Sequence, residues 1–178
     1  MVLFDAGFIS ILYHPNPRVP ADPATGNPPS FAKERIEHLI DTLSDDGEKI
    51  LIPTPALAEV LMALGKGGSQ AIATLHGEAV FRIVDFDERA AIELALMSEI
   101  TQGEKKHKDQ AGTWAKVKFD RQIVAIAKVN KATAIYSTDG DVLTLALKEG
   151  LRGFACHDLP MPPPENMELF DEQNPEAQ

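Results

Sequence analysis

The sequence has only one cysteine among its 178 residues, and it contains no long apolar run. The single Cys156 allows no internal disulfide and no cysteine-rich zinc site. No stretch approaches the roughly 20 apolar residues that a membrane-spanning helix needs, so we expect no membrane partner. The apolar start of the chain has no basic segment and is interrupted by Asp5, which is unlike a secretory signal. These absences favour a cytoplasmic protein.

Positive charge is also scarce, with 17 Lys and Arg residues against 27 Asp and Glu and a formal net charge of −10. A protein that holds nucleic acid by charge alone is normally basic, so the acidity counts against a passive nucleic-acid binder. It counts less against an enzyme whose acidic site holds divalent cations. A local cluster of Lys116, Lys118 and Arg121 is a candidate for contacts with nucleic-acid phosphates, and an ordinary solvated surface is the alternative.

The length fits one domain with a single core, and a content of 44% hydrophobic and 25% charged residues is typical of a globular protein. We place the domain at residues 1–158. Prolines and acidic residues dominate the remainder, residues 159–178, which we expect to be a tail that either wraps the surface or is disordered.

Short apolar runs alternate with helical patterns along the domain. The runs predict strands at residues 2–4, 50–52, 80–84, 134–136 and 153–156. Helical patterns lie at residues 6–13, 31–43, 54–64, 69–76, 88–100, 115–130 and 142–148, and residues 101–113 read as a polar loop. Six prolines make residues 14–30 a loop, of a length often found in lids and binding segments. This alternation predicts an α/β fold, with a parallel sheet covered on both faces and a site at the carboxyl ends of the strands.

Two acidic positions lie where predicted strands end. Asp5 follows the first strand directly, and an N-cap for the helix that begins at Ala6 is the alternative to a catalytic role. Asp139 follows the fourth strand, with Asp141 two residues later. One of these two acids is expected to cap the next helix. Asp139 is the better site candidate because it lies closer to the strand end.

Two further acids lie in apolar helical patterns. Glu59 is the only charged residue between positions 50 and 65, and a helix that is apolar all round is usually buried. A buried carboxylate needs a cation or a hydrogen-bond donor, from a metal site or from a distant partner. Asp120 precedes Ile123 and Val124 on the same helix face. The alternative for Asp120 is an acid in the first turn, stabilised by the helix dipole.

In a parallel sheet these four acidic positions lie at the same edge. Carboxylates that lie close together repel one another unless cations offset their charge. Oxygen ligands select hard cations such as Mg²⁺ or Mn²⁺, which activate water and stabilise the leaving oxygen of a phosphodiester. The sequence therefore predicts a metal-dependent nuclease, with the catalytic acids Asp5, Glu59, Asp120 and Asp139.

Four segments in this order resemble the PIN-domain family, and within it the VapC-like toxin ribonucleases. They are Val2–Asp5, Ile52–Leu61, Phe119–Ala127 and Ala134–Asp141. The resemblance implies a three-layer fold with a parallel sheet of roughly five strands. It also implies Mg²⁺- or Mn²⁺-dependent hydrolysis of RNA that leaves a 5′-phosphate and a 3′-hydroxyl. Two departures are Ala6, where family members often have Thr or Ser, and the long loop at residues 14–30.

The resemblance also implies roles for individual residues. Asp5, Asp120 and Asp139 would hold metal, and Glu59 would be a further ligand or would orient the attacking water. Ser137 matches a small hydroxyl residue that orders the site. Asp141 is a second-rank candidate that would reach the metal through water.

The expected partners are an RNA substrate, a small antitoxin protein and a second copy of the chain, the last two by resemblance alone. Two other functions remain open from the sequence. One is a non-catalytic PIN-like nucleic-acid-binding or scaffold protein, although the complete set of four acids argues against it. The other is a phosphatase of the haloacid type, which would need a second Asp two residues after Asp5, where this chain has Gly7.

Overall fold

The computed structural model describes residues 1–101 and 111–164, and within them the side chains of residues 1–97 and 118–164. Five strands form one sheet in the order β3-β2-β1-β4-β5, and every neighbouring pair is parallel. The strands are β1 (Val2–Phe4), β2 (Ile50–Pro53), β3 (Phe81–Val84), β4 (Ala134–Tyr136) and β5 (Arg152–Phe154). This is the predicted five-stranded parallel sheet, and each strand overlaps a predicted apolar run, although β5 ends at Phe154 because Cys156 begins a 3₁₀ turn.

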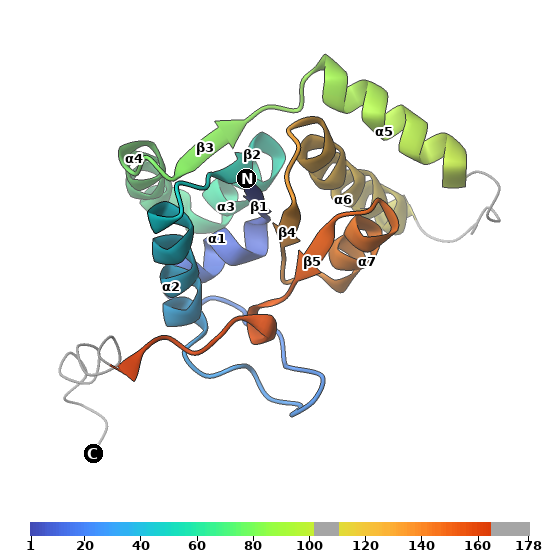
Figure 1. Ribbon diagram of the computed structural model, residues 1–178. Helices are drawn as coiled ribbons and strands as arrows, with labels where there is room; N and C mark the ends of the chain where they lie inside the picture. Colours follow the sequence, from blue (N-terminus) through green and yellow to red (C-terminus); the bar gives the residue numbers. More distant parts are fainter. Residues whose placement is uncertain (102–110, 165–178) are drawn as a thin grey trace.

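Helices flank the sheet and complete a three-layer α/β fold (Figure 1). They are α1 (Ala6–Tyr13), α2 (Ala32–Asp45), α3 (Thr54–Leu64), α4 (Gly68–Gly77), α5 (Glu88–Thr101), α6 (Ala111–Val129) and α7 (Gly140–Lys148), with short 3₁₀ turns at Gly65–Gly67 and Cys156–Asp158. The outermost helix, α5, packs against α6 (Figure 1). In the described part of the chain, no helix has both the length and the hydropathy that crossing a bilayer requires.

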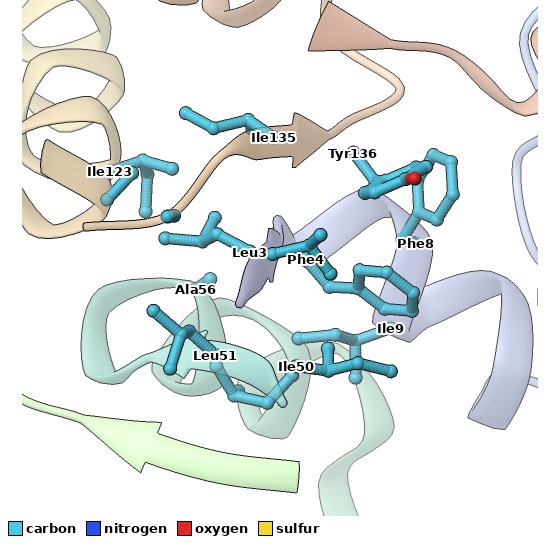
Figure 2. Packing of buried hydrophobic residues seen from close by; sticks show 14 of the residues in the cluster. Leu3, Phe4, Phe8, Ile9, Ile50, Leu51, Ala56, Ile123, Ile135 and Tyr136 are labelled. Carbon is cyan, nitrogen blue, oxygen red and sulfur yellow. The ribbon is translucent and has the colours of Figure 1, made fainter. Parts of the chain in front are cut away.

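The core lies on both faces of the sheet because the central strands are apolar on both sides. On one face, Phe4 of β1 lies beside Tyr136 of β4 and Phe8 of α1 (Figure 2). Leu3 points to the opposite face, on the same side as Ile123 of α6 (Figure 2). The helices therefore bury both faces of the strands whose ends carry the predicted site.

Four aromatic rings form a cluster on the α1 face of the sheet. The ring centroids of Phe4 and Phe8 lie 5.4 Å apart, and the Tyr136 ring lies 5.4 Å from Phe4 and 5.7 Å from Phe8. Phe154 of β5 stacks on Tyr136 at 5.1 Å. Tilted and offset ring pairs at these distances stabilise a core beyond their buried area. The cluster joins β1, α1, β4 and β5 directly beneath the strand ends.

An ion-pair cluster holds α5 and α7 to α6. Lys128 Nζ of α6 lies 2.5 Å from Glu93 Oε1 of α5 and 2.6 Å from Glu149 Oε2, the residue that ends α7. Burial lowers the pKa of Lys128, but the bonds to Glu149 and Glu93 outweigh burial and raise it overall. The charge of this lysine therefore stabilises the helix layer on that side of the sheet.

Two predictions about the helices need correction. The helix expected to begin at about Ala115 begins at Ala111, although Gly112 and Thr113 have a weak helical preference. The other residues of the loop expected at 101–113 are Thr101, which ends α5, and residues 102–110, which lie outside the described part of the chain. The apolar α3 is not buried all round, because Met62 is 78% exposed and Ala58 and Glu59 are also exposed.

The start of the predicted tail lies against α2. Leu159 is buried, and the Arg35 guanidinium of α2 donates hydrogen bonds to the Leu159 carbonyl oxygen and to the Met161 sulfur. Residues 159–161 therefore cover part of the α2 surface. Residues 165–178 lie outside the described part of the chain.

Candidate active site at the carboxyl edge of the sheet

Asp5 lies at the junction of β1 and α1, where it is 8% exposed. Its backbone N–H donates to the Tyr136 carbonyl oxygen at 3.0 Å, which extends the pairing of β1 with β4 by one residue. Its Oδ1 atom accepts a hydrogen bond from the Ala6 N–H at 2.7 Å and caps α1. The N-cap interpretation of Asp5 is thus correct, and the cap fixes the carboxylate at the edge of the sheet.

Ser137 joins the ends of β1 and β4. Its side chain is fully buried, and its hydroxyl donates to Asp5 Oδ2 at 2.7 Å. Ser137 Oγ also accepts a hydrogen bond from the Asp139 N–H at 3.0 Å. Asp139 Oδ1 in turn accepts from the Asp141 N–H at 2.8 Å and caps α7. One chain of hydrogen bonds therefore connects Asp5, Ser137, Asp139 and Asp141, the four residues that the sequence placed at these strand ends.

The charges at this edge act on one another. Burial raises the pKa of Asp5, the hydrogen bonds from Ser137 and Ala6 oppose that rise, and the charge of Asp139 adds to it. The pKa of Glu59 is also raised, first by desolvation of its carboxyl group and then by the charges of Asp5 and Asp139. Three of the four predicted acids are therefore close enough to repel one another.

Glu59 reaches this group from an exposed position. The sequence predicts a buried lone carboxylate at this position, but the Glu59 side chain is exposed on α3. The error arose because α3 is apolar in sequence yet turns Ala58 and Met62 outward. Glu59 thus faces the acidic edge from the solvent side, and burial alone does not demand a partner for it.

Asp120 is 9% exposed in the middle of α6. Because α6 begins at Ala111, Asp120 is not in the first turn, and the helix dipole does not explain its position. The helix leads into β4, so its earlier residues lie toward the carboxyl edge of the sheet. The N-terminal half of α6 therefore lies toward the edge that carries Asp5 and Asp139, and Asp120 lies where that half ends.

The fold is shared with solved toxin structures. VapBC2 from Rickettsia felis, bound to a DNA fragment from its promoter, matches with a TM-score of 0.55 and 13% identity over 87% of this chain and 98% of that chain. VapC20 from Mycobacterium tuberculosis, a toxin that cleaves the sarcin-ricin loop, matches with a TM-score of 0.52 and 13% identity over 90% of this chain and 100% of its own. No family model and no curated protein matches the sequence.

The chain has the VapC-like PIN fold. The match extends over nearly the whole length of both solved chains. At 13% identity the likeness shows the path of the backbone and not the side chains of the site.

The acidic edge of this PIN fold offers the right donor chemistry for a hard cation. Asp5, Asp139 and Glu59 provide carboxylate oxygens whose mutual repulsion a cation would relieve. Among the described residues, however, no group of three or more His, Cys, Asp or Glu side chains is already arranged around a metal position. Both oxygens of Asp5 accept hydrogen bonds within the protein, and Asp139 Oδ1 accepts another. The Asp5–Asp139 pair is therefore the formed part of the candidate site.

The predicted phosphate-binding residues lie on α6, the helix that carries Asp120. Lys118 is exposed and Arg121 is half-buried. The side chain of Lys116 lies outside the part of the chain that the structure describes. Two of the three cations are thus placed within one turn of Asp120.

A cavity of 560 Å³ lies away from the acidic edge, between α1, α2, α4 and β3. Charged side chains of α2 line it beside Tyr13 and Glu78. Burial, followed by the charges of Glu78 and Glu37, raises the pKa of Tyr13 to about 12. None of the four predicted acids lines this cavity, so its size does not identify it as the catalytic centre.

Sequence reasoning missed the contact of Gly7 with Thr138 beside the site. A β-carbon on Gly7 would lie 1.9 Å from Thr138 Oγ1. The available signal was a glycine in the first turn of a helix, where glycine is unfavourable without a packing reason.

Replacing Ser137 with alanine is expected to lower the free energy of unfolding by about 1–3 kcal/mol. The change removes the donor to Asp5 and the acceptor for the Asp139 N–H, so buried polar groups lose their partners. Chemical denaturation in metal-free buffer measures the loss. A Ser44→Ala variant, changed at an exposed position of α2, should stay within about 0.5 kcal/mol of the wild type. Equal stability of the two variants would contradict the linking role of Ser137.

Proposed function

We propose that the protein is a metal-dependent ribonuclease that hydrolyses phosphodiester bonds at the carboxyl edge of its sheet. The observation that carries the proposal is the hydrogen-bonded link from Asp5 through Ser137 to Asp139, which holds two carboxylates at adjacent strand ends. The PIN fold supports it, since the similar VapC20 is a toxin that cleaves the sarcin-ricin loop. Two acids held together against their repulsion are unfavourable without a cation, and they form a suitable place to bind one.

Each residue of the site has a proposed role. Asp5, Asp139 and Asp120 would hold Mg²⁺ or Mn²⁺, and Asp141 would act through water. A bound divalent cation supplies the charge that activates water and stabilises the leaving oxygen. Glu59, exposed beside this pair, would complete the ligands or orient the attacking water. Ser137 keeps Asp5 in place, and Lys116, Lys118 and Arg121 would bind the phosphates of the RNA on either side of the cleaved bond.

The proposed partners follow from the same likeness. The similar structure from Rickettsia felis is VapBC2 bound to DNA, which supports a small antitoxin protein as the partner of this chain. The proposed role is therefore the toxin of a toxin–antitoxin pair that assembles as a homodimer in the cytoplasm. Co-expression with the product of the neighbouring gene, followed by co-purification, tests this assignment separately from the chemistry.

An Asp139→Asn variant tests the chemistry. Asparagine is as good an N-cap as aspartate, so α7 should keep its cap while the site loses a charged ligand. With labelled single-stranded RNA, the wild type should cut in Mg²⁺ or Mn²⁺ but not in EDTA. The cleavage rate of the variant should fall by at least roughly 10- to 100-fold, which is the usual effect of losing even an outer-shell partner of a metal.

Asp87→Asn is a matched control, because Asp87 Oδ1 accepts a hydrogen bond from the Ala90 N–H in the first turn of α5. This variant also exchanges a capping aspartate for asparagine, and it should cut at the wild-type rate. Cleavage that persists in EDTA, or that is equal in the two variants, would exclude the proposed site. Mn²⁺ binding without cleavage of any RNA would instead indicate a very selective target.

A further inference from the structure

Gly7 and Thr138 meet where the first and fourth strands end. Gly7 is the second residue of α1, two positions after Asp5, and Thr138 lies between Ser137 and Asp139. A β-carbon on Gly7 would lie 1.9 Å from Thr138 Oγ1, 2.8 Å from its Cβ and 2.9 Å from its Cγ2. The Thr138 side chain therefore occupies the space that any other residue at position 7 would need.

The lack of room for a side chain, and not the backbone conformation, explains why residue 7 is a glycine. Gly7 is not among the residues with a positive φ, so its backbone is open to any amino acid. Glycine destabilises a helix relative to alanine, and α1 has only eight residues. The chain carries this unfavourable residue at the point where Thr138 leaves no room for a methyl group.

The same two segments carry the carboxylates of the proposed site. Asp5 and Asp139 are joined through the Ser137 hydroxyl, and the Asp5 N–H bonds to the Tyr136 carbonyl oxygen. Hydrogen bonds limit how far the segments separate. The packing of Thr138 on the bare Gly7 backbone limits how closely they approach.

We infer that Gly7 and Thr138 are positioning residues that set the separation of the Asp5 and Asp139 carboxylates. The inference rests on the proposed nuclease function, because that separation matters only if the pair acts on one cation. A misplacement of about 1 Å in a catalytic group is enough to reduce the rate by about 10²-fold. A single added methyl group at Gly7 is large enough to cause such a shift.

A Gly7→Ala variant tests this directly. The new methyl group should push residues 137–139 away from α1, so that the dissociation constant for Mn²⁺ rises and kcat falls, each by about tenfold or more. The KM for RNA should change little, since neither residue belongs to the proposed phosphate-binding set on α6. In metal-free buffer, Tm should fall, although alanine would otherwise stabilise a helix.

Removing the obstacle should restore the site. Thr138→Gly eliminates all three Thr138 atoms that a β-carbon at position 7 would meet, so Gly7→Ala combined with Thr138→Gly should regain much of the Tm and Mn²⁺ affinity that Gly7→Ala loses. Gly77→Ala is the matched control, because Gly77 also lies in a helix and a β-carbon there meets nothing within 4 Å. It should bind Mn²⁺ and cut like the wild type.

Three outcomes separate the two levels of the inference. A Gly7→Ala protein that matches Gly77→Ala in Tm, Mn²⁺ affinity and kcat would overturn the positioning contact while leaving the nuclease proposal intact. The contact would also be overturned if the effects of Gly7→Ala and Thr138→Gly simply added, without rescue in the double variant. A wild type that neither binds Mn²⁺ nor cuts RNA would overturn the proposed function and, with it, the role assigned to the contact.

Discussion

Asp5→Asn protein is expected to unfold at a higher temperature than the wild type in metal-free buffer at neutral pH, and to lose cleavage. The pKa of Asp5 is raised by burial and by the charge of Asp139, against the two hydrogen bonds that lower it. A carboxyl group with a raised pKa contributes stability that is fully present below its unfolded pKa of 3.8 and is lost as pH rises through its folded pKa. Asparagine stays neutral, so the variant avoids that loss, which we expect to exceed the cost of replacing one of the two carboxylate acceptors of Asp5 with an amide N–H.

Thermal unfolding in EDTA between pH 4 and pH 8 measures the difference. The Tm values of the two proteins should be closest at pH 4, and the Tm of the variant relative to that of the wild type should increase as pH rises. Each kcal/mol corresponds to about 2–4 °C in Tm for a domain of this size. Asp46→Asn, at an exposed position that ends α2, should follow the wild type throughout. A variant less stable than the wild type at pH 7 would mean that the hydrogen bonds of Asp5 outweigh burial and repulsion.

Adding a divalent metal should reverse the order of stability of the wild type and Asp5→Asn. A ligand that binds only the folded protein stabilises it by about 2.7 kcal/mol at a concentration of 100 times its dissociation constant. Adding Mn²⁺ should therefore raise the Tm of the wild type and leave the Tm of Asp5→Asn nearly unchanged. The wild type is thus expected to be the less stable protein without metal and the active one with it, because the same charge pair is unfavourable in one state and required in the other.

The fold could be predicted because its strands are short apolar runs bounded by turn residues and polar residues. Val2–Phe4 and Ala134–Tyr136 are buried on both faces, so each appears in sequence as a continuous apolar segment that ends at a polar residue. The same feature located Asp5 and Asp139, since residues that follow such strands lie at the carboxyl edge of the sheet, whereas Ser137 was indicated only by the resemblance to the PIN-domain family. Position along a strand is a local property, and local properties are readable from one sequence.

What could not be predicted depends on contacts between distant segments. Whether Glu59 is buried depends on which side of α3 faces the core, and an apolar helix gives no indication of that. The fit of Thr138 on Gly7 joins residues 131 positions apart, as counted from the two residue numbers. Tertiary packing decides both, and neither leaves a periodic pattern.

The aromatic cluster beneath the site leads to the largest expected effect on stability. Phe8→Ala should lower the free energy of unfolding by about 3–5 kcal/mol, the usual cost of truncating a fully buried phenylalanine. Phe8 is fully buried, and its ring contacts both Phe4 of β1 and Tyr136 of β4. The cavity would open where α1 crosses the two strands that carry Asp5 and Ser137. Chemical denaturation of the metal-free protein measures the change.

Phe8→Leu keeps an apolar side chain in this space but loses both ring contacts, so it should cost less than Phe8→Ala, which makes the pair a graded test of packing. Phe8 lies three residues after Asp5, and Tyr136 directly precedes Ser137. The cavity should therefore also raise the dissociation constant for Mn²⁺ of those Phe8→Ala molecules that remain folded. If Phe8→Ala lost stability but bound Mn²⁺ like the wild type, the hydrogen bonds at the strand ends alone would be enough to hold the carboxylate pair. If both properties fell together in Phe8→Ala and were retained in Phe8→Leu, the aromatic cluster would be the support on which the acidic edge depends.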